Sequence, residues 1–158
     1  MEVSWENPGP PIWSPDGKAF AYSAGAAGQR RIFLRYLNSP AATPLTDAAR
    51  VWGPVGWSAD SKRVFANGLN PQGTTPPYAL FSIPVFGGEP EFVRTTDAVR
   101  GRVAVETISP DGNTLALLGL AENGRFTVFT ASPPGSALRR YTPAPFETNG
   151  LNPGSSRH

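Results

Sequence analysis

A short pattern, an aromatic or aliphatic residue followed by a polar turn, recurs three times in the chain. It reads WSPDGK at residues 13–18, WSADSK at 57–62 and ISPDGN at 108–113. The turn serines, at positions 14, 58 and 109, are 44 and then 51 residues apart. Proline and glycine inside a short polar segment mark tight turns between strands. The pattern therefore predicts a β-hairpin that belongs to an internal repeat of roughly 40–50 residues.

Two further features keep a similar period. An apolar run after each turn contains Phe33, Phe81 or Phe129, and these phenylalanines are 48 and 48 residues apart. Two linkers between units are nearly identical, TDAAR at 46–50 and TDAVR at 96–100. Features that recur independently at one period indicate repeated structural units rather than a single hairpin.

Each unit contains four short segments with the alternation of strands, and no segment keeps a helical period over ten or more residues. The expected strands are 11–14, 18–23, 31–37, 43–46, 55–58, 63–68, 78–85, 91–96, 103–109, 114–120, 125–131 and 138–142. A repeat of four antiparallel strands is typical of a β-propeller blade. We therefore predict an all-β chain that forms an incomplete β-propeller of about three four-stranded antiparallel blades.

The repeat also gives expected bounds for the blades. We expect an N-terminal extension at 1–8, blade 1 at 9–50, blade 2 at 51–100, blade 3 at 101–143, and a truncated fourth blade or tail at 144–158. Closed propellers commonly have four to eight blades, and an arc of three leaves apolar blade faces exposed at both ends. We expect these faces to meet the remaining blades of a longer propeller, a protein partner or a second copy of the chain.

Ten residues are expected to shape the turns: Ser14, Pro15, Asp16, Gly17, Ser58, Asp60, Ser109, Pro110, Asp111 and Gly112. Proline presets φ, and glycine takes positive φ at little cost. Ser61 replaces that glycine in the second turn, and a left-handed serine costs roughly 1 kcal/mol. Aspartate in such turns usually binds backbone N–H groups, and no turn has the second acid that a calcium loop needs. We assign no metal and no cofactor.

Composition and missing motifs exclude several function classes. The chain has 158 residues, no cysteine and a net charge of +2, and its basic residues are scattered, so we expect no thiolate site and no nucleic-acid binding. No apolar run approaches the ~20 residues of a membrane span. The only histidine is His158, the last residue, and no G-x-S-x-G elbow is present. We therefore expect no enzymatic activity.

One loop is long enough to be a candidate contact surface. It reads NGLNPQGTTPPY at residues 67–78, and long loops at a propeller rim often carry recognition. The residues expected to make such contacts are Asn70, Gln72, Thr74 and Tyr78. A tolerated insertion without a binding role is the alternative interpretation of this loop.

Unit 1, PIWSPDGKAFAY at 11–22, resembles the WD-like repeat of the TolB β-propeller family, as does IPVFGGEPEFV at 83–93 in unit 2. Unit 3 departs from the repeat because Ile108 replaces the tryptophan. The resemblance covers roughly 9–146 and implies the propeller fold. Propellers of this family occur in periplasmic Tol proteins, in bacterial serine/threonine kinases and regulators, and as gating domains of prolyl-oligopeptidase-type peptidases. The kinase or regulator type is the most similar.

The resemblance implies a non-catalytic module that binds proteins or ligands in a bacterial signalling or cell-envelope protein. The alternative is the gating propeller of a prolyl-oligopeptidase-type serine peptidase whose hydrolase domain is absent here. A parent of the envelope or receptor-kinase type would place the chain in the periplasm or outside the cytoplasm, and other parents would leave it cytoplasmic. In either case we expect Trp13 and Phe81 to pack in the core, where replacement by alanine costs ~3 kcal/mol or more.

Overall fold

The chain folds into strands and turns, without a helix, over the residues that the structure, a computed structural model, describes: 9–26, 29–46, 51–74, 77–96 and 103–142. The strands there are β1 (Ile12–Trp13), β2 (Ala19–Ala24), β3 (Arg31–Tyr36), β4 (Ala42–Pro44), β5 (Val51–Trp57), β6 (Arg63–Leu69), β7 (Tyr78–Pro84), β8 (Glu91–Thr95), β9 (Val103–Ile108), β10 (Leu115–Leu120), β11 (Phe126–Ala131) and β12 (Arg139–Arg140).

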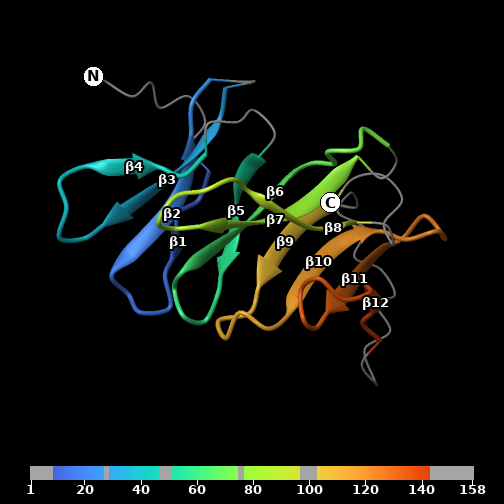
Figure 1. Cartoon of the computed structure of the whole chain (residues 1–158). Helices are drawn as coiled ribbons and strands as arrows, with labels where there is room; N and C mark the ends of the chain where they lie inside the picture. The colour runs from blue at the N-terminus through green and yellow to red at the C-terminus, as the bar shows by residue number, and fades with distance from the viewer. Residues whose placement is uncertain (1–8, 27–28, 47–50, 75–76, 97–102, 143–158) are drawn as a thin grey trace, which may run out of the picture.

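The strands form three separate four-stranded sheets. Their orders are β1-β2-β3-β4, β5-β6-β7-β8 and β9-β10-β11-β12, and every pairing is antiparallel. The sheets lie side by side in chain order, as the colours of Figure 1 show. The prediction of an all-β arc of three four-stranded blades is confirmed, and we call the sheets blades 1, 2 and 3.

The strands fall within the expected blade ranges, but the bounds themselves stay predictions. Residues 47–50 and 97–102, where two bounds were placed, lie outside the described residues, as do 1–8 and 144–158. β5 begins at Val51 rather than Val55, because two register shifts in its pairing with β6 accommodate Gly53 and Pro54 within the strand.

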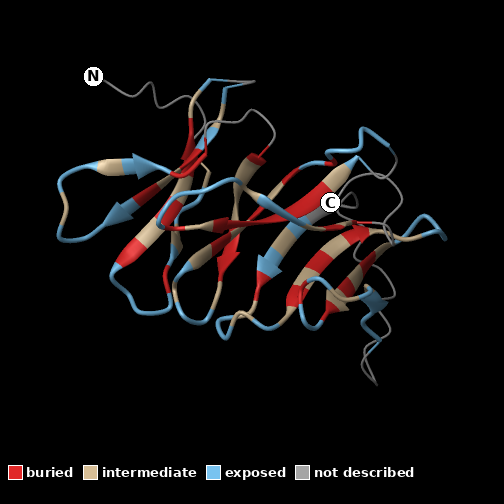
Figure 2. Ribbon diagram, viewed as in Figure 1, coloured by how far each residue is buried: buried red, intermediate tan, exposed pale blue. Residues whose placement is uncertain are grey.

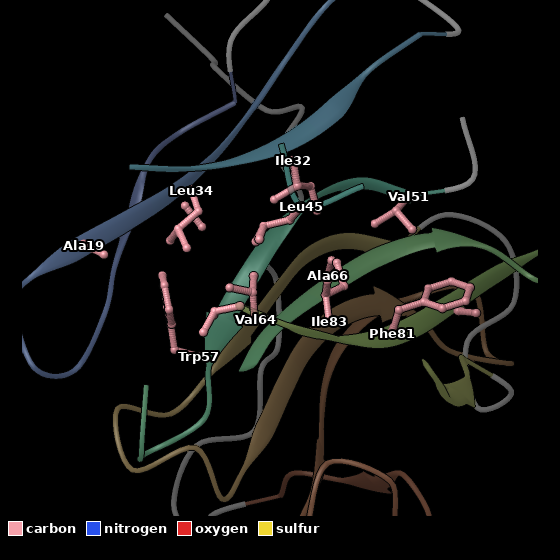
Figure 3. Close-up of a cluster of buried hydrophobic side chains, with 13 residues drawn as sticks. Ala19, Ile32, Leu34, Leu45, Val51, Trp57, Val64, Ala66, Phe81 and Ile83 are labelled. Carbon is pink, nitrogen blue, oxygen red and sulfur yellow. The ribbon is translucent and has the colours of Figure 1, made fainter. Parts of the chain in front are cut away.

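The core consists of two apolar layers between neighbouring blades. One layer joins blades 1 and 2, and Figure 3 shows its side chains, including Leu34 on β3 and Trp57 on β5. The other layer joins blades 2 and 3 and includes Leu80 and Phe129. Burial alternates along the central strands, which appears as alternating red and tan segments in Figure 2. Each blade is thus held mainly by its neighbours.

Candidate functional site

The three turns share one hydrogen-bond pattern. The serine hydroxyl donates to the aspartate Oδ1 over 2.6 Å in the first two turns and 2.5 Å in the third. The same Oδ1 accepts the backbone N–H two residues later at 3.0 Å in every turn. The serine Oγ also accepts the N–H five residues after it, at 3.0, 3.0 and 2.9 Å. The pairs are Ser14–Asp16, Ser58–Asp60 and Ser109–Asp111.

These hydrogen bonds make the turn carboxylates poor bases. The pKa of Asp16, Asp60 and Asp111 is lowered, first by the serine hydroxyl and then by the backbone N–H. A carboxylate with a lowered pKa does not take a proton readily from a serine. Within the described ranges, no three Asp, Glu, His or Cys side chains gather as a candidate metal site. The serine hydroxyl and the aspartate Oδ1 of each turn are therefore engaged in hydrogen bonds within that turn.

Turns of neighbouring blades touch one another. The backbone N–H of Asp16 in blade 1 donates to Ser61 Oγ in blade 2 over 3.3 Å. A Cβ added at Gly112 in blade 3 would stand 2.6 Å from the backbone nitrogen of Ala59 in blade 2. A Cβ added at Gly17 in blade 1 would meet nothing within 4 Å. The three turns thus form a row, and the blade 1 end of that row is open.

The candidate contact loop is organised around Asn70. Its Oδ1 accepts the N–H of Gln72 at 3.0 Å, and its Nδ2 donates to the backbone oxygen and the hydroxyl of Thr74, both at 3.3 Å. Asn70 is buried, whereas Gln72 and Thr74 are exposed. Tyr78 is partly buried and makes an edge-on contact with Trp52. Of the four residues, only Gln72 and Thr74 are exposed, and a role of this loop in binding stays a prediction.

A buried carboxyl group lies between blades 2 and 3. Burial raises the pKa of Glu106 on β9 to about 7, and a hydrogen bond with the side chain of Asn67 on β6 lowers it in part. Glu106 Oε2 and Asn67 Oδ1 are both buried without a hydrogen-bond partner. A Cβ added at Gly53 would stand 3.5 Å from Ser23 Oγ and 4.0 Å from Asn67 Oδ1. Polar side chains of blades 1 and 2 therefore approach one another around Gly53, and Glu106 of blade 3 contacts the same Asn67.

The two tryptophans before the turns have opposite environments. Trp57 in blade 2 is 4% exposed, and its Nε1 donates to the backbone oxygen of Ile12 in blade 1 over 3.0 Å. Trp13, at the same place in blade 1, is 56% exposed, so the expectation that it packs in the core is wrong. The reason is that no blade precedes blade 1 in the described structure. Phe81 does pack in the core, with 6% exposed.

The open face of blade 1 carries a continuous aromatic row. Trp13 packs edge-on against Phe20, with ring centroids 5.5 Å apart. Phe20 lies next to Tyr22 at 5.8 Å, and Tyr22 stacks on Phe33 at 5.6 Å. Leu37, the residue directly after β3 in the same blade, is 61% exposed. Its counterpart in blade 2, Val85, is buried against blade 1. We call Trp13, Phe20, Tyr22, Phe33 and Leu37 the open face.

Solved structures with the same arrangement decide the fold type. A TolB from Agrobacterium tumefaciens matches with a TM-score of 0.63 and 21% identity, over 83% of this chain and 48% of that one. The fold is that of a TolB-type β-propeller. TolB from Acinetobacter baumannii matches with a TM-score of 0.63 and 18% identity, over 85% of this chain and 32% of that one. This propeller arc therefore spans less than half the length of either protein.

Peptidase propellers are similar as well. The β-propeller domain of the trilobed protease from Pyrococcus furiosus matches with a TM-score of 0.58 and 12% identity, over 90% of this chain and 44% of that one. No protein-family model and no curated protein matches the sequence. In the described part of the propeller, no helix has the length and apolar character needed to cross a membrane.

The sequence did not point to Glu106 or to the contrast between the tryptophans. Glu106 lies in the strand-like run VAVETIS, where alternation alone allows it to be a solvent-facing residue. Trp13 and Trp57 stand in nearly identical motifs, so only the presence or absence of a preceding blade separates them.

Proposed function

We propose that the chain is a non-catalytic TolB-like β-propeller module that binds protein partners or ligands in a bacterial signalling or cell-envelope protein. The observation that carries the proposal is the open face of blade 1, whose counterparts in blade 2 are all buried against a neighbouring blade. Contiguous exposed apolar surface of this kind marks a site of association. The remaining blades of a longer propeller are the simplest occupants.

The chemistry of the described residues supports binding rather than catalysis. The hydroxyl groups of the turn serines donate hydrogen bonds to aspartates whose pKa is lowered, so no strong base lies beside these serines. A serine nucleophile requires such a base within hydrogen-bond reach. Among the described residues, the group with a pKa near neutrality is Glu106, which is buried between blades and forms a hydrogen bond with the side-chain amide of Asn67.

The second candidate is a gating propeller of a prolyl-oligopeptidase-type serine peptidase. It is favoured by the fold similarity to peptidase propellers, including the acylaminoacyl peptidase from Pyrococcus horikoshii, which has a TM-score of 0.54 and 14% identity. In this case the arc would restrict access to a hydrolase domain instead of binding a signalling partner. Similarity at this level of sequence identity supports the fold alone. The same propeller fold is therefore compatible with both candidate functions.

Photo-crosslinking in the native bacterium tests the proposal. Benzoylphenylalanine replaces Trp13 on the open face in one variant and Phe86, which is 82% exposed on the turn after β7, in the control. We expect discrete adducts from position 13 that the control does not give. Adducts to a signalling or envelope protein support the first candidate, and adducts to a hydrolase domain support the second. The binding proposal is wrong if position 13 gives no adduct beyond those of position 86.

A further inference from the structure

The open face of blade 1 carries arginine at positions 31 and 35, where the equivalent faces of blades 2 and 3 bury uncharged residues. The counterparts of Arg31 are Ala79 and Thr127, and Arg35 is the arginine beside Phe20. Arg35 pairs with Phe20 in blade 1, as Ile83 pairs with Val64 in blade 2. Ala131 holds the same place in blade 3, where it pairs with Leu115. Ile83 is 0% exposed and Ala131 is 2% exposed, because each packs toward the preceding blade. Arg35 is exposed, and it stands where the fold otherwise buries an apolar side chain.

A blade that covered Arg35 would have to satisfy its charge. A guanidinium group removed from water without a partner is strongly destabilising, whereas a carboxylate can bind it through two parallel hydrogen bonds. The strand register places Arg35 beside the aromatic row, since Phe20 pairs with both Trp13 and Arg35. The open face therefore combines a large aromatic surface with a positive charge.

Within the described residues, the surface that a second copy of the chain would bring to the open face does not offer the matching charge. Its free surface would be the far face of blade 3, whose described residues include Val105, Ala116, Leu118, Val128, Thr130 and Arg139. This set contains no carboxylate and one further cation. Val105 is 58% exposed, so the surface is available, but its described residues offer Arg35 no opposite charge. Charge thus disfavours closure of two copies into one ring.

We propose that the open face of blade 1 binds a further propeller blade that places a carboxylate opposite Arg35 and a backbone carbonyl within reach of Trp13 Nε1. The carbonyl requirement follows from Trp57, whose Nε1 already makes this bond to Ile12 in the seam between blades 1 and 2. The inference rests on the proposed binding role of the open face. It adds the chemical character of the occupant and distinguishes that occupant from blade 3 of a second copy.

The test gives blade 3 the missing carboxylate. Thr130 is the blade 3 counterpart of Leu34, because both follow the phenylalanine of the repeat. Leu34 shares one buried cluster with Ile83, the counterpart of Arg35. A glutamate at position 130 would therefore lie in the same seam as Arg35 if two copies closed into a ring. The variants are Thr130→Glu, its uncharged control Thr130→Gln, and Thr130→Glu combined with Arg35→Met.

Sedimentation equilibrium of the purified full chains measures their association, and circular dichroism verifies that each variant is folded. We expect the wild type and Thr130→Gln to remain single chains. Thr130→Glu should associate at least about tenfold more tightly, and both added salt and Arg35→Met should remove the gain. If Thr130→Glu does not fold, Thr130→Asp takes its place.

Three results would overturn the inference. In the first, the wild type forms closed pairs, which makes a second copy the occupant. In the second, the glutamine and glutamate variants associate equally. In the third, a folded glutamate variant stays a single chain. Because the crosslinking experiment depends on Trp13 and not on an acidic partner, it can succeed where this test fails, so the two failures are distinguishable.

Discussion

Trp57 joins blade 2 to blade 1 through a hydrogen bond of 3.0 Å from its Nε1 to the backbone oxygen of Ile12. The indole is buried in the same seam, beside Leu34 and Val64, as Figure 3 shows. The equivalent indole of Trp13 packs on Phe20 of its own blade, is covered by no preceding blade in the described structure, and is 56% exposed. One residue type at one repeat position thus serves as a core residue in blade 2 and as a surface residue in blade 1.

Replacement of the two tryptophans by alanine should have unequal effects. Trp57→Ala removes a buried aromatic side chain and a hydrogen bond, so we expect a loss of ~3–5 kcal/mol in the free energy of unfolding. Trp13→Ala removes a largely exposed side chain and should cost less than about 1 kcal/mol. Urea denaturation measures both. Equal losses would mean that Trp13 is buried in solution.

Alanine at the turn glycines should distinguish the covered turn from the open one. Gly112 has a φ of 71°, and a Cβ there would stand 2.6 Å from the backbone nitrogen of Ala59. Gly17 has a φ of 69° but open space around it. We expect Gly17→Ala to cost about 1 kcal/mol from backbone strain alone, and Gly112→Ala to cost clearly more because blades must move apart. Thermal unfolding midpoints test this order.

Ser61 offers a complementary test in the middle turn. Its φ is 58°, a left-handed conformation that glycine adopts more easily, but its hydroxyl accepts the N–H of Asp16 from blade 1. Ser61→Gly relieves strain and loses the hydrogen bond, so we expect it to be nearly neutral. Ser61→Ala keeps the strain and loses the hydrogen bond, and should cost about 1 kcal/mol more than Ser61→Gly. Greater stability of the alanine variant would contradict this account.

Glu106 should make stability fall as the pH rises. Its pKa is about 7 in the folded protein against an ordinary value of 4.5, so the folded state holds more protons between these two pH values. The stabilising contribution of Glu106 to the free energy of unfolding is therefore complete below pH 4.5 and is lost as the pH rises toward 7. Over this range the free energy of unfolding falls by at most about 1.4 kcal/mol per pH unit. Glu106→Gln should remove this slope. An unchanged slope in urea titrations from pH 5 to 8 would refute it.

The fold could be predicted because every strand carries its own signal. β2, β10 and β11 are short apolar runs bounded by turn residues, and the turns after β2 and β10 contain Gly25 and Gly124, which have positive φ. The start of β5 was missed because Gly53 and Pro54 are typical of turns, although register shifts keep them in the strand. The sequence pattern of a segment predicts its structure wherever interactions within that segment determine the structure.

The candidate site was less predictable because it depends on contacts between blades. Asn70 was expected to contact a partner but binds its own loop, a role that its neighbours Pro71 and Gly73 do not reveal. Glu106 acquires its raised pKa only when blade 2 covers it. Arg35 is unusual only by comparison with Ile83 and Ala131, and that comparison requires the strand register.

Hydroxyl-radical oxidation of the purified chain, read by mass spectrometry, tests the central claim that blade 1 has an open face and blade 2 does not. With 56% of Trp13 and 4% of Trp57 exposed, we predict that Trp13 oxidises many times faster than Trp57. Addition of an occupant that covers the face should slow the oxidation of Trp13 and leave that of Trp57 unchanged. Equal oxidation rates of the two tryptophans in the isolated chain would contradict the account.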